Sequence, residues 1–141
     1  MFVAVRLVPS VCSRSCADLS FLPGGGVPLT QNRTKWPIDG GALSILPGWN
    51  AGHPTSFFYV NMGFGTQPRN MTNVIVSVFQ ITGPSRDPFP GSFCLPDLPL
   101  PKNASVQVGD NATLQVIQVA LHGASLYNVR FLPRSAELWT R

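Results

Sequence analysis

Hydrophobic and polar residues alternate in short runs along this chain, and no run has apolar residues at the spacing of an amphipathic helix. The alternation is clearest in Leu114–Leu121, weaker in Ser56–Gly63, and apolar on both faces in Val74–Ile81. Shorter β-type runs occupy Ala42–Leu46 and Ala124–Phe131, and Gly, Pro and Asn separate the runs. The pattern therefore predicts an all-β chain built from about six short strands.

This arrangement favours an immunoglobulin-like or fibronectin-III-like antiparallel β-sandwich. A strand that is apolar on both faces is typical of the centre of a sheet, so Val74–Ile81 is predicted to be central, with Leu114–Leu121 in the same core. Val78→Ala should then cost about 1–3 kcal/mol. The side chains expected to be largely buried are Val76, Val78, Phe79, Val116, Ile117 and Val119.

The remaining segments are predicted to be connections. Residues 1–22 show no clear strand pattern, and Gly83–Leu100 is dense in proline, which cannot donate a hydrogen bond to a sheet. Pro37 places the end of the run that begins near Thr30 at an edge or strand end. We therefore divide the chain into an atypical N-terminal segment (1–22), one β-sandwich domain (23–132) and a C-terminal tail (133–141).

Composition limits the function classes. The chain has 141 residues, enough for one domain, with 44% hydrophobic but only 11% charged residues. Its formal charge is +4, yet the basic residues are scattered and not interleaved with aromatic residues. We therefore expect no nucleic-acid partner. No apolar run reaches the length of a transmembrane helix, so none is predicted.

Four N-x-S/T sequons occur where chance gives about one, since the chain has eight Asn and twenty Ser plus Thr in 141 residues (8 × 20/141). This excess favours a secreted or cell-surface glycoprotein with N-glycans on exposed loops. Asn111 is the best candidate because Gly109-Asp110-Asn111 resembles a turn before a strand. The predicted glycosylation sites are Asn32, Asn70, Asn103 and Asn111.

The N-terminus and the cysteines fit secretion less well. Met1–Val11 is apolar but short, and Arg6 interrupts it, so it is a poor signal peptide. The C-terminus carries no apolar lipid-anchor signal. The chain has three cysteines, an odd number. Cys94 is a candidate for a disulfide with an unknown partner, and Cys12 or Cys16 is a candidate partner.

Four segments, taken in order, resemble one fungal family, the copper-acquisition-factor-like domains, which are related to lytic polysaccharide monooxygenases and are often GPI-anchored. The resemblance covers about residues 23–128 and implies an immunoglobulin-like sandwich with a copper cofactor. The segments are Asn32-Arg33-Thr34-x-Trp36-Pro37-Ile38-x-Gly40-Gly41-Ala42-Leu43, Phe93-Cys94-Leu95-Pro96, Asp110-Asn111-Ala112-Thr113-Leu114-Gln115-Val116-Ile117, and Leu126-Tyr127-Asn128.

In that family a mature N-terminal histidine, a second histidine and an aspartate hold Cu(II), and imidazole and carboxylate suit that ion. By resemblance, His53 stands at the position of the second histidine. No histidine precedes His53, and Val129-Arg130-Phe131 follows the Tyr-Asn pair where the family has a cysteine and an aspartate. His122-Gly123 is interpreted as a hairpin turn. Two explanations for these departures stay open. One is an altered gene model, with a degenerate signal or wrong first exon and a read-through after Asn128, and the other is a genuinely divergent member that lost copper.

The resemblance implies a role in copper binding or uptake at the fungal cell surface, and we expect this copy to lack an intact copper site and not to be an enzyme. Arg130 near the missing aspartate adds repulsion of a dication. Two alternatives stay open. One is a metal-free cell-wall or interaction module, which an exposed aromatic row would favour. The other is a polysaccharide monooxygenase, whose chemistry needs a redox-active copper with an open position in a fixed geometry. The single surviving ligand argues against it.

Overall fold

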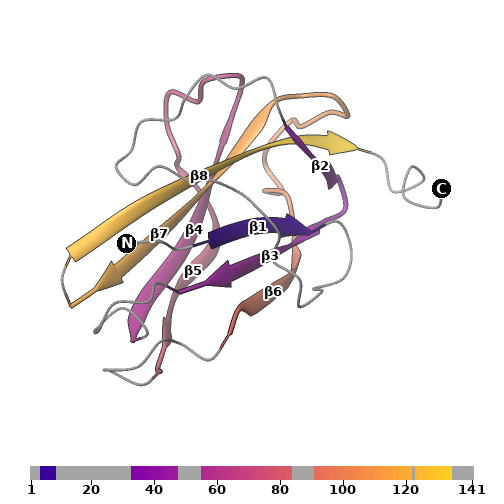
Figure 1. Cartoon of the computed structure of the whole chain (residues 1–141). Coiled ribbons are helices and arrows are strands. Elements are labelled where there is room, and N and C mark those ends of the chain that lie inside the picture. Colours follow the sequence, from indigo (N-terminus) through magenta and orange to yellow (C-terminus); the bar gives the residue numbers. More distant parts are fainter. Residues whose placement is uncertain (1–3, 9–32, 48–54, 84–90, 122, 135–141) are drawn as a thin grey trace.

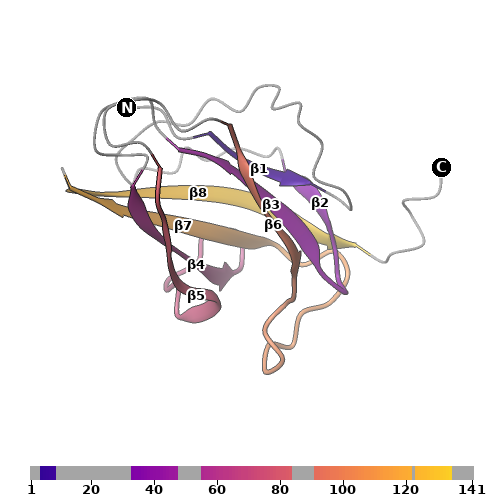
Figure 2. The same cartoon turned by 90° about the horizontal axis from the view of Figure 1, so that it is seen from below.

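Two β-sheets face each other in the computed structural model, which describes residues 4–8, 33–47, 55–83, 91–121 and 123–134 (Figures 1 and 2). One sheet has the order β1-β3-β6 and the other the order β2-β8-β7-β4-β5. Among the described residues we find no helix with the length and apolar character needed to cross a membrane. The strands are β1 (Ala4–Val8), β2 (Thr34–Pro37), β3 (Gly41–Leu46), β4 (Ser56–Phe64), β5 (Asn73–Ile81), β6 (Phe93–Leu98), β7 (Ala112–Ala120) and β8 (Gly123–Arg134).

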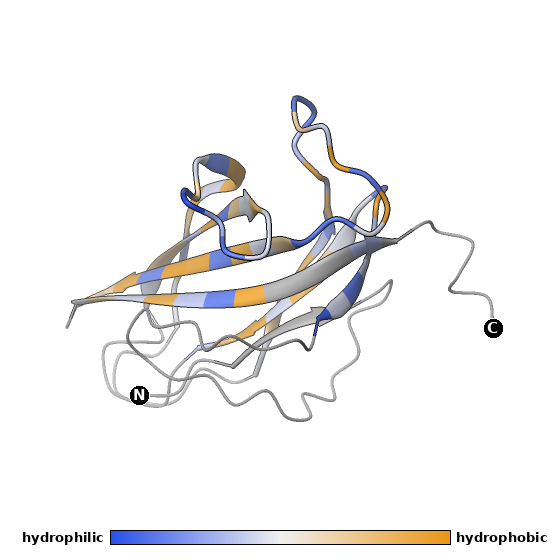
Figure 3. Ribbon diagram, turned by 90° about the horizontal axis from the view of Figure 1, so that it is seen from above, coloured by the Kyte–Doolittle hydropathy of each residue, from blue (hydrophilic) through white to orange (hydrophobic). Residues whose placement is uncertain are grey.

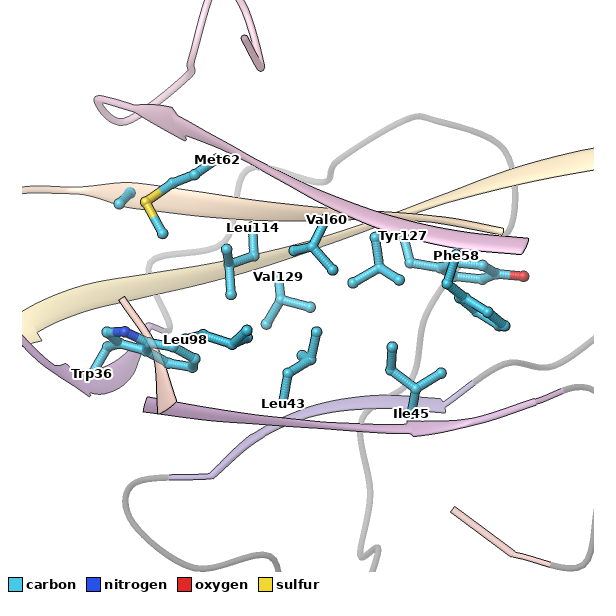
Figure 4. Packing of buried hydrophobic residues seen from close by; sticks show 12 residues of the cluster. Trp36, Leu43, Ile45, Phe58, Val60, Met62, Leu98, Leu114, Tyr127 and Val129 are labelled. Carbon is cyan, nitrogen blue, oxygen red and sulfur yellow. The ribbon is translucent and has the colours of Figure 1, made fainter. Parts of the chain in front are cut away.

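The core lies between the sheets and draws on both (Figure 4). Strand alternation explains its composition, because Phe58, Val60 and Met62 are every second residue of β4 and all are fully buried. β7 contributes Leu114 and Val116 in the same way. The predicted β-sandwich is thus confirmed, with one addition: β2 pairs parallel with β8, whereas the other pairs among the described strands are antiparallel.

Three phenylalanines close the side of the sandwich where the two edge strands β5 and β6 meet. The rings of Phe58 and Phe93 lie edge to face with their centroids 5.4 Å apart, and Phe79 lies 6.0 Å from Phe58. Phe79 and Phe93 are 5.8 Å apart, also edge to face. Aromatic pairs at such separations add about 0.5–1.5 kcal/mol each to the burial of their rings. This cluster joins the two sheets, because β4 and β5 belong to one sheet and β6 to the other.

The turn from β2 to β3 explains the first segment of the family resemblance. Gly40 has φ +127°, and its amide donates to the carbonyl of Pro37 at 3.2 Å. Gly41 lies against the indole of the fully buried Trp36, and a Cβ there would come within 2.6 Å of the ring. Both glycines are therefore needed for the chain to pass from one sheet to the other around Trp36. This segment builds the scaffold.

The predicted central position of Val74–Ile81 is wrong. β5 covers this run but is an edge strand among the described strands, where it pairs with β4 alone. Leu114–Leu121 is paired within the same core as predicted, because β7 lies between β4 and β8. β5 also has two extra residues relative to β4, because the register shifts between Phe58 and Val60 and again between Val60 and Asn61. Such bulges break the two-residue alternation of side chains.

The edge position and bulges of β5 explain which of its predicted core side chains are buried. Val116 and Ile117 are buried as predicted, and Val76 and Phe79 are partly buried against the core. Val78 is 64% exposed, and Val119 is exposed on the outer side of β7, so both predictions are wrong. Val78→Ala therefore no longer carries the cost of a core truncation.

Two strands lie where the sequence predicted none. β1 lies within residues 1–22 and pairs with β3, so Ala4 is opposite Leu46. β6 lies within the proline-dense Gly83–Leu100 segment and also pairs with β3. Pro96 is tolerated because β6 is an edge strand with a register shift next to it, where Asp97 adopts φ +55°.

Candidate functional site

The candidate copper ligand His53 lies outside the described residues, as do His122 and Asn32. The residues that flank it are described. β3 ends at Leu46 and the described chain resumes at Thr55, directly before β4. The geometry at this end of the sandwich is therefore given by the strand ends around it.

Several strands begin or end together here, at the left of Figure 1. Ser56 at the start of β4 is opposite Ile81 at the end of β5 and Ala120 at the end of β7, and Ala120 is opposite Gly123 at the start of β8. In the other sheet, the first residue of β1 is opposite the last residue of β3. We call this the Ser56 end, and we call the opposite end, where β7 begins, the Ala112 end.

Two side-chain hydrogen bonds fix β4 at the Ser56 end. The Nε2 of Gln118 donates to the Oγ of Ser56 at 3.1 Å, and both residues are buried in the core. The Oγ1 of Thr55 donates to the carbonyl of Gly83 at 2.9 Å and accepts from its amide at 3.3 Å. A buried polar pair of this kind is costly to disturb, because its groups have no water to replace a lost partner. Side-chain hydrogen bonds therefore hold the start of β4 to β7 on one side and to the residues after β5 on the other.

The three carboxylates among the described residues are at the other end. Asp39 lies in the turn before β3, Asp97 lies next to Leu98, which pairs with Gly41, and Asp110 lies just before β7. β4 is nine residues long, so the Ser56 and Ala112 ends are about 27 Å apart at roughly 3.4 Å per residue. Within the described ranges, no group of three or more His, Cys, Asp or Glu side chains could hold a metal ion.

Arg130 is also far from the Ser56 end. Its backbone is opposite Thr113 near the start of β7, whereas the Ser56 end is at Ala120. That spacing of seven residues is about 24 Å, several times the Debye length of about 8 Å at physiological salt. The expectation that Arg130 repels a dication near His53 therefore has no geometric support.

Cys94 and Tyr127 belong to the scaffold. Cys94 is opposite Ser44 in the β3–β6 pair and is disulfide-bonded, while Cys12 and Cys16 lie outside the described residues. Tyr127 is in the core, where burial raises the pKa of its phenol above the usual value and the nearby Ser125 side chain partly offsets the rise. Neither residue is a candidate ligand.

The three described sequons lie in connections. Asn70 is exposed, and its Oδ1 accepts from the hydroxyl of Thr72 in the same sequon at 3.3 Å. Asn103 is exposed in a turn that the amide of Ala104 closes on Pro101 at 3.0 Å. Asn111 does stand between a turn and a strand, but it is half-buried and its Nδ2 donates to Thr66 at 3.0 Å.

A second surface was not singled out from the sequence. The residues of β4 that alternate with the core positions, Phe57, Tyr59 and Asn61, face away from the three-stranded sheet. Their partners on β7 are Val119, Ile117 and Gln115. We call this the outer face of the five-stranded sheet. The alternation in β4 and β7 was visible in the sequence, but only the register shows that these side chains form continuous rows.

The fold and the comparisons together define the class of this protein. The chain matches the family described as "Copper acquisition factor BIM1-like" over residues 7–136. It therefore belongs to the family of BIM1-like copper acquisition factors. The match extends beyond residues 23–128, on which the sequence resemblance was drawn, to include part of β1 and all of β8.

Named relatives are fungal. The chain is 59% identical over 106 residues to "Lytic polysaccharide monooxygenase-like protein X325" of Aspergillus fumigatus. These residues make up 75% of this chain and 44% of the relative. It is 55% identical over 106 residues to "Lytic polysaccharide monooxygenase-like protein" of Emericella nidulans, covering 75% and 43%. It is 50% identical over 119 residues to "Lytic polysaccharide monooxygenase-like protein ham-7" of Neurospora crassa, covering 79% and 52%. The chain thus spans about half the length of these relatives.

Proposed function

We propose that this chain is a secreted or cell-surface fungal glycoprotein module that keeps the copper-acquisition scaffold, lacks an intact copper site and is not an enzyme. The family match supports the link to copper, and the four sequons support entry into the secretory pathway. On this proposal its partners are N-glycans, cell-surface components and weakly held Cu(II).

The observation that carries the proposal is the separation of donor types. The three described carboxylates lie away from the strand ends next to His53. Asp110 precedes Ala112, about 27 Å along β4 from Ser56, and Asp39 and Asp97 lie beside the start of β3, about 17 Å along that strand from Leu46.

Residues 1–52 contain no histidine that could supply a second imidazole. The residues that flank the other histidine, His122, also lie at the Ser56 end, because Ala120 is opposite both Ser56 and Gly123. An imidazole that no chelate ring joins to a second donor is displaced by protons below its usual pKa of about 6.5. Within the described ranges, no carboxylate lies beside the strand ends that flank His53, and this supports weak rather than tight binding of Cu(II).

Isothermal titration calorimetry with Cu(II) at neutral pH tests this proposal. We expect weak binding that His53→Ala leaves unchanged, with His122→Ala as the matched control in the other histidine. A reductant-driven assay on insoluble polysaccharide should give no oxidised product. Tight one-to-one binding that His53→Ala abolishes would overturn the proposal, because it would show that other residues complete a site around His53. If His122→Ala abolished the binding too, His122 would be one of those residues.

A further inference from the structure

The outer face of the five-stranded sheet exposes a continuous set of apolar side chains. Phe57 is 46% exposed, and its β7 partner Val119 and the neighbouring Leu126 of β8 are also exposed. Val78 on β5 extends the set to the sheet edge. Contiguous apolar patches on a protein surface are usually covered by a ligand or partner, because an uncovered patch favours aggregation.

The same face carries a row of amides next to the apolar rows. Asn61, Gln115 and Asn128 are opposite one another on β4, β7 and β8. The Nε2 of Gln115 donates to the Oδ1 of Asn128 at 3.2 Å, and both residues are partly exposed. None of the described side chains in these rows is charged. A neutral occupant with both hydroxyl groups and apolar faces matches such a surface, whereas a charged partner does not.

The sequons of Asn70 and Asn111 lie at the Ala112 end of the outer face, beside the amide row. Gly63 follows Asn61 on the outer side of β4, and a Cβ built there would come within 2.6 Å of the backbone oxygen of Asn70. The loop that carries Asn70 therefore folds over this end of the sheet. Asn111 is tied to the same loop, through Thr66 and through the amide of Gly65, which donates to the Asn111 carbonyl at 2.7 Å.

The views agree with this placement. Figure 2 shows the connections after β4 and after β6 projecting from the side of β7 that faces away from β1 and β3. In Figure 3, seen from the opposite side, the same connections rise beside β7 and β8, whose ribbons alternate between hydrophobic and hydrophilic residues. A group attached to either loop thus starts beside the outer face.

We propose that the N-linked oligosaccharides of Asn70 and Asn111 lie along the outer face, with sugar hydroxyls on the amide row and apolar sugar faces on Tyr59 and Phe57. This inference rests on the proposed glycoprotein function. Attachment of a sugar replaces one of the two Nδ2 hydrogens, so Asn111 keeps the other for its bond to Thr66. The glycans then shield the apolar patch that the strands alone leave in water.

The test uses the whole chain secreted from a fungal host, with mass spectrometry of each sequon and binding of the dye ANS, which reports exposed apolar surface. Asn70→Gln with Asn111→Gln should raise ANS fluorescence and lower Tm by about 3–5 °C. Asn103→Gln, which removes the glycan from a separate turn, should change neither. Equal effects of Asn103→Gln and of the double variant would overturn the inference.

A second comparison distinguishes shielding from a general effect of glycosylation on folding. In the variant that lacks the Asn70 and Asn111 sequons, Val78→Ser should return ANS fluorescence toward the wild-type level, whereas Val108→Ser should not. Val78 is 64% exposed on β5 and Val108 is 53% exposed in the loop before β7, so the substitutions are matched. Unmodified Asn70 and Asn111 on secreted protein would refute the glycoprotein proposal and this inference together. Occupied sites whose loss leaves ANS fluorescence unchanged would refute this inference alone.

Discussion

β7 and β5 have similar sequences and very different environments. Each is a nine-residue run of β-branched and apolar residues with no charge, and each looks like a central strand. β7 has partners on both sides and pairs with β4 in continuous register, whereas β5 has one partner and two register shifts. An apolar pattern on both faces therefore identifies a strand but not its place in the sheet.

The difference also changes what the apolar side chains do. On β7 the inward positions fill the core, as Leu114 and Val116 show. On β5 the bulges turn some apolar side chains toward the core and leave Val74 and Val78 in solvent. Bulges also make an edge strand a poorer template for pairing with another chain. The bulges of β5 thus make its packing against the core less regular, and they also make this sheet edge less able to pair with a strand of another chain.

The largest expected effect comes from making the same substitution in both strands. Val116→Ala removes two methyl groups from a fully buried site and should lower the free energy of unfolding by about 1–3 kcal/mol. Val78→Ala, on the exposed side of β5, should change it by less than about 0.5 kcal/mol. Urea denaturation of both variants measures the difference. Equal losses would show that β5 is packed like a central strand.

Much of the fold could be predicted from the sequence, and the errors have identifiable causes. β3, β4, β5, β7 and β8 all coincide with predicted runs, because regular alternation is a local property. β6 was missed because Pro96 argues against a strand, and the edge position and neighbouring bulge that tolerate it are tertiary features. β1 was missed because its five residues are interrupted by Arg6 and form a strand only by pairing with β3.

The candidate site was less predictable for a different reason. Resemblance assigned His53 by position in the chain, but a metal site depends on which strand ends meet. The register shows that the nearest described strand ends on either side of His53, Leu46 and Ser56, lie at the Ser56 end, while β8 carries the segment after Asn128 toward the Ala112 end. Likewise, the rows of the outer face follow from the pairing of β4, β7 and β8, which no single strand reveals.

A smaller difference in stability is expected between loss of the hydrogen bond on the β7 side of β4 and loss of those on its β5 side, both at the Ser56 end. Ser56→Ala removes the hydroxyl that accepts from Gln118 in the core, and we expect a loss of about 1 kcal/mol in the free energy of unfolding. Thr55→Val removes the bonds to Gly83 at the end of β5 but retains the side-chain shape, and should cost about half as much because water can reach the partly exposed site. A larger loss in Thr55→Val than in Ser56→Ala would mean that the β5 side holds β4 more firmly than the β7 side.

The smallest effect concerns pH. β8 packs the buried Tyr127 opposite Val116 of β7, whereas β5 has no ionisable side chain. Because burial raises the pKa of Tyr127 in the folded state, the folded protein holds its phenolic proton at alkaline pH values where the unfolded chain has released it. Tyr127 therefore leaves stability unchanged at neutral pH and lowers it as pH rises above the unfolded value of about 10. In Tyr127→Phe this alkaline loss should be smaller than in the wild type when unfolding is followed by circular dichroism from pH 8 to 11. The matched control Tyr59→Phe, on the outer side of β4, should leave the loss in place. An alkaline loss that is the same in Tyr127→Phe and in the wild type would show that the β7–β8 pair does not shield this phenol from water, and would remove one of the differences between this part of the sheet and β5.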